Sequence, residues 1–508
     1  HFAGGSAPPV GRSTWCYHYG FRFQTRFLNM LRPSPTAAAV LGLMAALAAG
    51  ASSAAPSATA PMGFGDARVL LHERADIMAA DRAEIARAES EAEAAKSLSG
   101  PKVEMDVKQV WGTKTVDLGI DTGLGQLSGL GGSQIGGVPG QIISGLAQKY
   151  NHVDIHFKED IGGPRAAVTA TLPIYTGGLI TAQQNALNHK VSETRADRDM
   201  RENTLDAELA ARYWGVQLAR SVAALHRSVL EDQNEELRRA KRFEQKGLIA
   251  KVERLAVEVA RDNAKRTLVS AESDVGVAEA ELMRQLRETS LPELSSPLFV
   301  LTGDLGTLDQ WQNRANAQSP AIRKMNALRA QAGEGISAAE ASFKPKVYAF
   351  GTKNLIKHYL TLPEPDWMAG VGVTFTLWDN HDRFDKLNAA RSVVTKAEAA
   401  CSEAKNQVAT AVEVAFLRVM QAREEFELTG STVELARENL RLREASFAEG
   451  LSNAVDVDTA RTKLTGAEVA RRAAAYKFVV SWAMLHASAG AMPDFVNSLT
   501  RSDLVVVK

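Results

Sequence analysis

Three polar residues in one short alternating stretch have the spacing of metal ligands. His152, Asp154 and His156 are separated by single apolar residues. Side chains of a strand point alternately to opposite faces, so these three would share one face. Imidazole and carboxylate groups both bind transition metals, but a polar face in contact with water needs no metal. We therefore predict a water-facing strand surface and no bound metal, with a metal site as the alternative.

No catalytic motif accompanies these residues. The sequence contains neither CxxC nor HExxH, and the glycines between Gly119 and Gly140 include no GxxxxGK[ST] phosphate-binding motif. We interpret that glycine-rich stretch as a flexible extracellular loop. Cys16 and Cys401 are the only cysteines, and Cys401 lies in a helical pattern where a packing role is expected. The sequence thus predicts that the protein is not an enzyme and that it binds no cofactor.

The composition indicates a helical protein with balanced charge. The 508 residues include 59 Lys and Arg and 59 Asp and Glu, so the formal net charge is zero. A nucleic-acid-binding protein usually carries a basic excess, and none is present overall. Aromatic residues make up only 6% of the chain, and its Ala-rich, charge-rich sequence favours long, closely packed helices.

Residues 30–55 have the pattern of a secretory signal peptide. A positive charge and the apolar run 36–49 follow Met30, and small residues suited to cleavage come next. The run is shorter than the ~20 residues needed to span a bilayer. We expect cleavage within 49–55 and interpret residues 1–29 as an extension upstream of the natural start. Charges interrupt every later apolar stretch, so no transmembrane helix is predicted.

The remaining sequence repeats itself. The segments TLPIYTGG (171–178) and FTLWDNHDR (375–383) each lead into a long helical stretch, and aligning Ile174 with Leu377 gives an offset of 203 (377 − 174). The later glycines of KGLIAKVE and EGLSNAVD repeat that offset. Two landmarks with one ungapped offset predict an internal duplication, with repeats over 56–300 and 301–508.

Each repeat is expected to contain a long helical hairpin, over 178–288 and 382–488. Apolar residues in the first arms recur at alternating spacings of four and three, as in coiled coils. They are Leu218, Val222, Leu225 and Val229, and Val408, Val412, Ala415 and Val419. The chain should turn at the two tip glycines. Shorter helices, predicted from Asp66 to Leu98 and from Leu308 to Phe343, precede a proline in each repeat.

Four stretches alternate as membrane strands do, about 102–111, 152–172, 346–352 and 366–377. Alternation of apolar with small or polar residues over ~10 positions is typical of a transmembrane β-barrel. Strands of a soluble sandwich are the alternative. Four strands cannot close a barrel, because single-chain barrels need at least ~8. The open edges would have to pair with other copies of the chain, in a number that the residues alone leave undecided.

The duplicated layout, the junctions LPIYTGG and FTLWDNH, and the glycine turns followed by an acidic residue resemble the TolC-type outer-membrane efflux family. The resemblance covers nearly all of the sequence after the signal peptide. It implies a mainly α fold with a small β part. Duplicated helical hairpins would form a homotrimeric α-barrel, and four strands per protomer would form a 12-stranded transmembrane β-barrel.

The resemblance also implies a function. The chain would be a passive exit duct of a tripartite efflux or type I secretion system, in the outer membrane of a Gram-negative bacterium and extending into the periplasm. Its partners would be outer-membrane lipid, a periplasmic adaptor protein and an inner-membrane pump, with no nucleic acid. A periplasmic adaptor or a coiled-coil scaffold without a channel is the alternative. A duplicated hairpin argues against the first, and alternating strands argue against the second.

Site residues follow from the same resemblance. The tip pairs Gly247-Leu248 and Gly450-Leu451 match the family's adaptor contacts. Asp456 lies six residues beyond the second tip glycine, as does the family's pore-constricting acidic residue, and Glu253 is its equivalent in the first repeat.

The match at the constriction is incomplete. The family's second acidic residue, nine beyond the glycine, is replaced here by Thr459, with Asp458 beside it. A ring of symmetry-related carboxylates would narrow a pore and select cations. Helix N-terminal capping, or stabilisation by the helix dipole, is the alternative role for Asp456.

Overall fold

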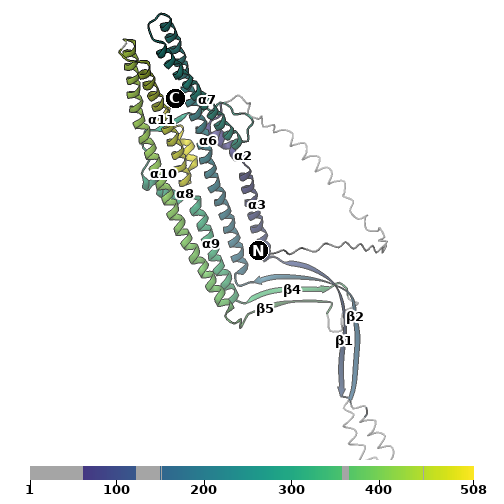
Figure 1. Ribbon diagram of the computed structural model, residues 1–508. Helices are drawn as coiled ribbons and strands as arrows, with labels where there is room; N and C mark the ends of the chain where they lie inside the picture. The colour runs from purple at the N-terminus through teal and green to yellow at the C-terminus, as the bar shows by residue number, and fades with distance from the viewer. Residues whose placement is uncertain (1–60, 122–148, 150–151, 357–364, 450, 508) are drawn as a thin grey trace, which may run out of the picture. The chain divides into compact units, whose positions relative to one another are not determined.

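The computed structural model describes residues 61–121, 149, 152–356, 365–449 and 451–507. As predicted, the fold is mainly helical with a small sheet part (Figure 1). The helices are α2 (Phe64–Arg74), α3 (Asp76–Lys96), α6 (Leu179–Gln245), α7 (Lys251–Leu286), α8 (Leu308–Gln318), α9 (Pro320–Glu340), α10 (Asp382–Ala448), α11 (Ala454–Ala489) and α12 (Met492–Ser498). The strands are β1 (Lys102–Asp121), β2 (His152–Tyr175), β3 (Leu298–Leu301), β4 (Lys346–Asn354), β5 (Trp367–Thr374) and β6 (Leu504–Val507).

The two halves of the chain repeat element by element. Helices α6 and α10 each have 67 residues, and α7 and α11 each have 36. Both pairs are offset by 203 residues (382 − 179 and 454 − 251). Before the strands, α2 and α8 have 11 residues each, α3 and α9 have 21 each, and the offset is 244 (308 − 64 and 320 − 76). The first half therefore contains 41 extra residues (244 − 203), located between the start of β1 and the start of α6.

The shorter helical stretches, expected to be continuous, are each broken once. Ala75 separates α2 from α3, and Ser319 separates α8 from α9; both have an extended ψ, of 124° and 123°. Pro320 explains the second break, because proline disfavours helical backbone in the residue before it and is well suited to the first helical position. The first break has the same backbone without a proline.

The long helices form a layer in which each hairpin contacts the other. Helix α6 packs against α7 and α11, and α11 packs against α10. Figure 1 shows these four helices running side by side. Two of the residues predicted to lie on the coiled-coil face, Val412 and Val419, are fully buried. Helices α3 and α9 pack against α6, and α9 also contacts α10.

The larger sheet has the order β1-β2-β4-β5 and is antiparallel throughout. Strand β1 pairs with β2 along its whole length, whereas β4 pairs with β2 only from Ala167 to Tyr175. Strand β1 is longer than the expected 102–111, and the loop predicted from Gly119 begins no earlier than residue 122. Thr113, Thr115 and other residues suited to strands extend the ladder there. The rest of that predicted loop lies outside the described residues.

A second sheet joins β3 to β6 and was not predicted. Its four-residue strands are too short to show alternation, and all of β3 is buried. Strand β3 is part of the main core, where fully buried aromatic residues meet from distant parts of the chain. The ring of Phe64 lies 4.7 Å from that of Trp214 and 5.4 Å from that of Phe495. Tyr213 donates a hydrogen bond to the Met62 carbonyl at 2.8 Å, and burial raises the pKa of its hydroxyl.

The junctions between the sheet and the long helices use left-handed backbone in both halves. Gly177 and Gly178 have φ of +71° and +98°, and Asn380 and His381, 203 residues later, have φ of +51° and +71°. Glycine adopts this conformation without steric cost, and Asn and His are enriched among other residues that adopt it. The two halves therefore make the same bend with different residues.

Two further observations concern the helices. Cys401 is buried in α10, as expected for a packing residue. Among the helices that the structure describes, none combines the length and the apolar character needed to cross a membrane.

Candidate functional site at the helical turns

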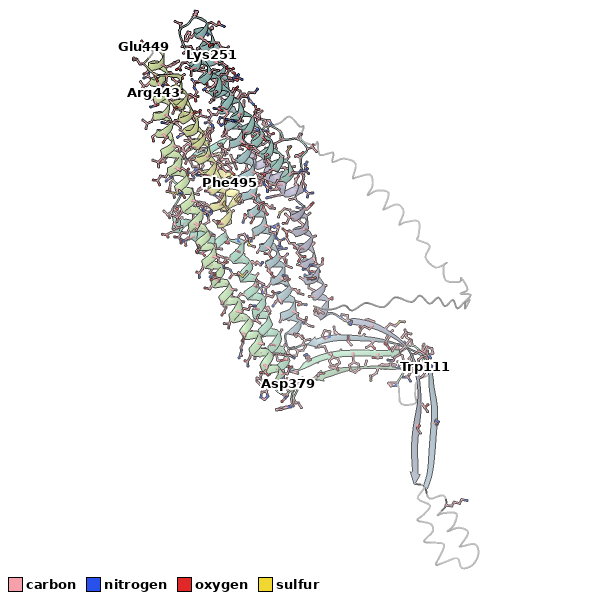
Figure 2. All side chains as sticks on the ribbon, in the orientation of Figure 1. Trp111, Lys251, Asp379, Arg443, Glu449 and Phe495 are labelled. Carbon is pink, nitrogen blue, oxygen red and sulfur yellow. The ribbon has the colours of Figure 1, made fainter. Side chains whose placement is uncertain are left out.

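The two hairpins turn with the same backbone hydrogen bond. The N–H of Leu248 donates to the carbonyl of Phe243 at 2.8 Å, and the N–H of Leu451 donates to that of Ser446 at 2.8 Å. Gly247 has φ of +70°, the conformation that ends many helices with glycine. Its predicted counterpart, Gly450, lies outside the described residues. Figure 2 shows Lys251 and Glu449, which flank the two turns.

Both turns expose a leucine. The side chains of Leu248 and Leu451 are 66% and 83% exposed, and they occupy equivalent places after the two turns. Single exposed apolar residues are common on protein surfaces. Here the same residue type is repeated at the turn of each hairpin, which provides a matched pair of apolar contact points.

Asp456 lies in the first turn of α11, but another residue provides the cap. The Oδ1 of Asn453 accepts a hydrogen bond from the backbone N–H of Asp456 at 2.8 Å. The Asp456 carboxylate accepts one from the Ser452 hydroxyl at 3.1 Å and lies 3.7 Å from the Arg443 guanidinium. The capping role considered for Asp456 therefore belongs to Asn453. The Asp456 side chain remains half-exposed at a helix N-terminus, where the helix dipole favours negative charge.

The other two predicted acidic residues contact different parts of the hairpins. Glu253 occupies the equivalent position in α7, and its N–H donates to the Ala250 carbonyl at 3.1 Å. Asp458 accepts a hydrogen bond from the Gln233 side-chain amide of α6 at 3.0 Å. Within one chain, then, Asp458 joins the two hairpins, whereas Asp456 faces α10.

A cavity of about 910 Å³ lies between the two hairpins near the turns. Leu248 and Glu253 contribute to it, and acidic residues outnumber basic ones in its lining. The charged residues are Asp232, Glu235, Glu236, Arg239, Glu253, Glu444, Arg461 and Glu468. A cationic or zwitterionic surface with an apolar part would complement this lining.

Arg443 and Arg461 were not predicted from the sequence. Arg461 is largely buried, and its guanidinium lies 3.3 Å from Glu236 of α6 and 3.0 Å from Glu444 of α10. It therefore connects three helices. Residue spacing gives no signal for such pairs, because they depend on the relative register of helices that are distant in sequence.

The strand residues considered as metal ligands, His152, Asp154 and His156, are part of β2. Their side chains lie outside the described part of the structure.

Comparison with known proteins supports one family. Residues 311–491, which include α9, β4, β5, α10 and α11, match the model of the outer membrane efflux protein family. The resemblance to outer-membrane efflux proteins is thereby confirmed. Channels of this family are transport ducts, in agreement with the prediction that the chain is not an enzyme. No curated protein sequence matches the chain.

Solved structures share the fold. A membrane protein from Pseudomonas aeruginosa matches with a TM-score of 0.65 at 13% identity, over 84% of this chain and 93% of that one. The outer membrane protein VceC from Vibrio cholerae matches with a TM-score of 0.64 at 12% identity, over 84% and 96%. The MtrE outer membrane channel of Neisseria gonorrhoeae matches with a TM-score of 0.60 at 16% identity, over 84% and 89%. At these identities the likeness concerns the fold.

Proposed function

We propose that the chain is one protomer of a homotrimeric outer-membrane channel, the passive exit duct of a tripartite efflux or type I secretion system. Three copies would close a helical tunnel in the periplasm and a 12-stranded β-barrel in the outer membrane of a Gram-negative bacterium. In this proposal the signal peptide 30–55 is removed, and the repeats 56–300 and 301–508 each supply two strands and one hairpin.

The observation that carries the proposal is that the helical layer has two different outer edges, each with exposed apolar residues. Helices α7 and α10 are the outermost of the four long helices, since each packs mainly on its own hairpin partner. On α10, Leu428, Leu435 and Leu442 are exposed at intervals of seven residues, and α7 exposes Leu255 and Val259. Rows spaced in this way match one face of a coiled coil and favour another helix as partner.

Joining these two edges would produce a ring. A contact between the α10 edge of one copy and the α7 edge of the next is heterologous, because it uses two different surfaces. Heterologous contacts generate closed rings when the rotation between copies closes. The exposed rows therefore support a cyclic assembly of this chain.

The sheet supports the same assembly. In the part of the sheet that the structure describes, β1 and β5 each have a neighbour on one side only. Alternate residues on β1, including Val103 and Val107, and on β5, including Val371 and Val373, are exposed and apolar. Such faces suit lipid, and in lipid the backbone groups of edge strands need partners. Three copies of four strands make twelve, above the ~8 that a barrel requires.

The turns supply the remaining roles in the proposal. Asp456, together with Glu253, would form the acidic constriction of the tunnel; Asp458 is a weaker candidate because Gln233 already binds its carboxylate. The tips Gly247, Leu248, Gly450 and Leu451 would contact a periplasmic adaptor protein, which would link the channel to an inner-membrane pump.

The experiment that tests this function is localisation and subunit counting of the processed chain. The chain is expressed in a Gram-negative host, outer membranes are extracted in mild detergent, and the complex mass is measured by native mass spectrometry. We expect a trimer in the outer-membrane fraction. A soluble periplasmic monomer would contradict the proposal and favour an adaptor or scaffold protein.

A further inference from the structure

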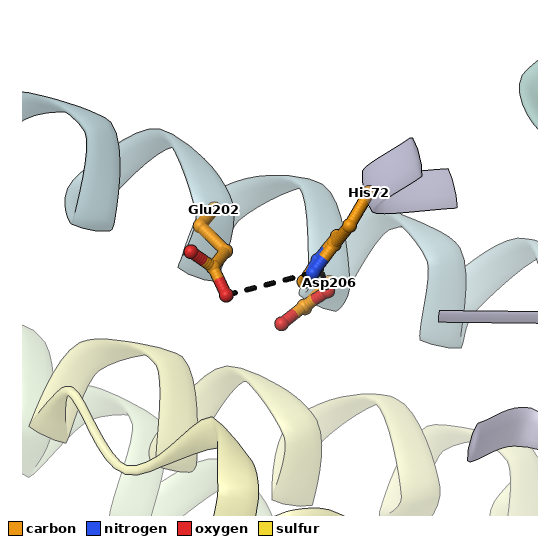
Figure 3. A group of neighbouring side chains, drawn as sticks. All are labelled: His72, Glu202 and Asp206. Atoms are coloured by element: carbon orange, nitrogen blue, oxygen red, sulfur yellow. Dashed lines mark hydrogen bonds and ion pairs between the residues drawn. The ribbon is translucent and has the colours of Figure 1, made fainter. Parts of the chain in front are cut away.

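We propose that His72, Glu202 and Asp206 form a binding site for a divalent transition-metal ion, with Zn²⁺ as the best-suited ion, that fastens α2 to α6. One ligand atom of each residue lies within 4.8 Å of the others (Figure 3). Imidazole nitrogen and carboxylate oxygen are common ligands of Zn²⁺. The site is distinct from the turns and from the duct function proposed above.

The two helices present these groups through matching spacings. Glu202 and Asp206 are four residues apart and therefore lie on one face of α6. Arg68 and His72 are likewise four residues apart on α2. The His72 Nε2 lies 2.6 Å from Oδ1 of Asp206, and its Nδ1 lies 3.5 Å from Oε1 of Glu202. A small movement would bring one nitrogen and both carboxylates to a common ion.

The three side chains of the site are partly or fully buried, and neighbouring residues hold them in place. Asp206 is fully buried, and His72 and Glu202 are partly buried. Arg68 donates from Nε to Oδ2 of Asp206 at 2.7 Å and from a terminal nitrogen to Oε1 of Glu202 at 3.2 Å. Metal-binding carboxylates are commonly held in this way by hydrogen bonds from a second layer of residues. With a neutral His72 imidazole, the positive charge of Arg68 and the two carboxylates sum to one negative charge. This net charge favours binding of a cation.

The second half of the internal duplication makes the equivalent helix contact without this cluster. Helix α8 is the counterpart of α2 and contacts α10, the counterpart of α6. At the offsets of 244 and 203, Arg68, His72, Glu202 and Asp206 correspond to Gln312, Asn316, Lys405 and Ala409. The second half thus makes the equivalent helix contact with no imidazole or carboxylate at these positions. The charged set is specific to the first half.

The duplication also supplies the test variants. His72→Asn and Arg68→Gln introduce the residues that the second half carries at the same places. The full chain is purified in detergent and stripped with EDTA, and Zn²⁺ binding is measured by calorimetry and by elemental analysis after dialysis. We expect one Zn²⁺ per chain in the wild type and none in His72→Asn. Arg68→Gln removes a positive charge beside both carboxylates and keeps all three ligands, so it should still bind one Zn²⁺ per chain.

His226→Asn is the matched control, because His226 is a partly buried histidine on α6, the helix that carries Glu202 and Asp206. It should bind Zn²⁺ as the wild type does. The absorption bands of bound Co²⁺ in the wild type, displaced by added Zn²⁺, provide a measurement that does not depend on any variant. An absence of Co²⁺ and Zn²⁺ binding in the wild type would show an ion-pair network only, and equal binding in His72→Asn would also overturn the site.

Discussion

The charge environment of Asp456 determines what this residue can contribute to a tunnel. Its carboxylate accepts a hydrogen bond from the Ser452 hydroxyl and lies near Arg443, whose side chain is also half-exposed. Exposed ion pairs of this kind stabilise a protein by about 0–1 kcal/mol. The pair therefore costs little to separate, and the carboxylate can respond to ions in solution.

We expect Asp456→Ala to reduce the cation preference of the reconstituted channel. A charge about 4 Å from a permeating ion is worth about 1 kcal/mol in water. Removing it should lower the cation-to-anion permeability ratio by roughly fivefold. Reversal potentials in planar bilayers under a salt gradient measure this ratio.

Asp458→Asn is the matched comparison for that experiment. Its carboxylate already accepts a hydrogen bond from Gln233, so we expect a smaller change in selectivity than for Asp456→Ala. An equal or larger change would show that Asp458, and not Asp456, faces the permeating ions.

His486 gives the stability of the core a dependence on pH. It is buried among aromatic side chains, with ring centroids 4.4 Å from Trp482 and 4.9 Å from Trp311. Burial lowers the pKa of His486 to about 4. Below pH ~6.5 the unfolded chain binds a proton that the folded protein does not accept until about pH 4. The free energy of unfolding should therefore fall as the pH falls through this window, by up to about 3 kcal/mol.

Chemical unfolding at pH 7 and pH 4.5 checks this expectation. The His486→Phe variant keeps an aromatic ring in the core but has no proton to bind, so its stability should depend less on pH. A variant with the same loss of stability on acidification as the wild type would exclude His486 as the cause.

At the scale of elements, the bends between strand and helix are sensitive to substitution. Gly178→Ala should cost about 1–2 kcal/mol, because its left-handed backbone disfavours a side chain, although no atom lies within 4 Å of the added Cβ. Gly177→Ala should cost more, because the added Cβ would lie 2.8 Å from the Ala341 carbonyl oxygen and 2.9 Å from Lys344 Cβ. Urea unfolding of the two variants measures the difference.

The second half provides the reverse experiment. His381 occupies the place of Gly178 with φ of +71°, so His381→Gly should keep or slightly raise stability. A clear loss would show that the contacts of His381 with Phe384 and Trp378 outweigh the strain of its backbone.

Local sequence patterns predict some elements of this fold better than others. The mainly helical fold is evident from spacings of four and three over long stretches without proline, because many turns repeat one signal. The four-residue strands β3 and β6 carry too few residues for any period. The contact of Asp458 with Gln233 joins residues 225 positions apart, so no local pattern could reveal it. The cluster of His72, Glu202 and Asp206 was not predicted from the sequence for the same reason, because His72 belongs to α2 and the two carboxylates belong to α6.

At the scale of the whole molecule, the leucine row of α10 should control assembly. Leu435→Glu would place a charge in the proposed contact between copies, and an unpaired buried charge costs several kcal/mol. We expect the trimer to dissociate, as measured by native mass spectrometry, while the helical circular dichroism of the chain is retained. Glu434→Gln changes charge at the adjacent exposed residue, away from the leucine row, and should leave the trimer intact. A trimer that survives Leu435→Glu would exclude this edge as the contact surface.

The uninterrupted length of α6 and α10 has a mechanical consequence. The helices that pack against them change along their length, from α3 and α9 near the sheet to α7 and α11 near the turns. The two long helices themselves continue without a break. At ~1.5 Å per residue, 67 residues make a lever of roughly 100 Å. A tilt of about 10° pivoted at the sheet would carry the turns through roughly 17 Å, as follows from that length. In the proposed channel, a modest force applied at the turns would thus widen the aperture between copies while the strands stay in place.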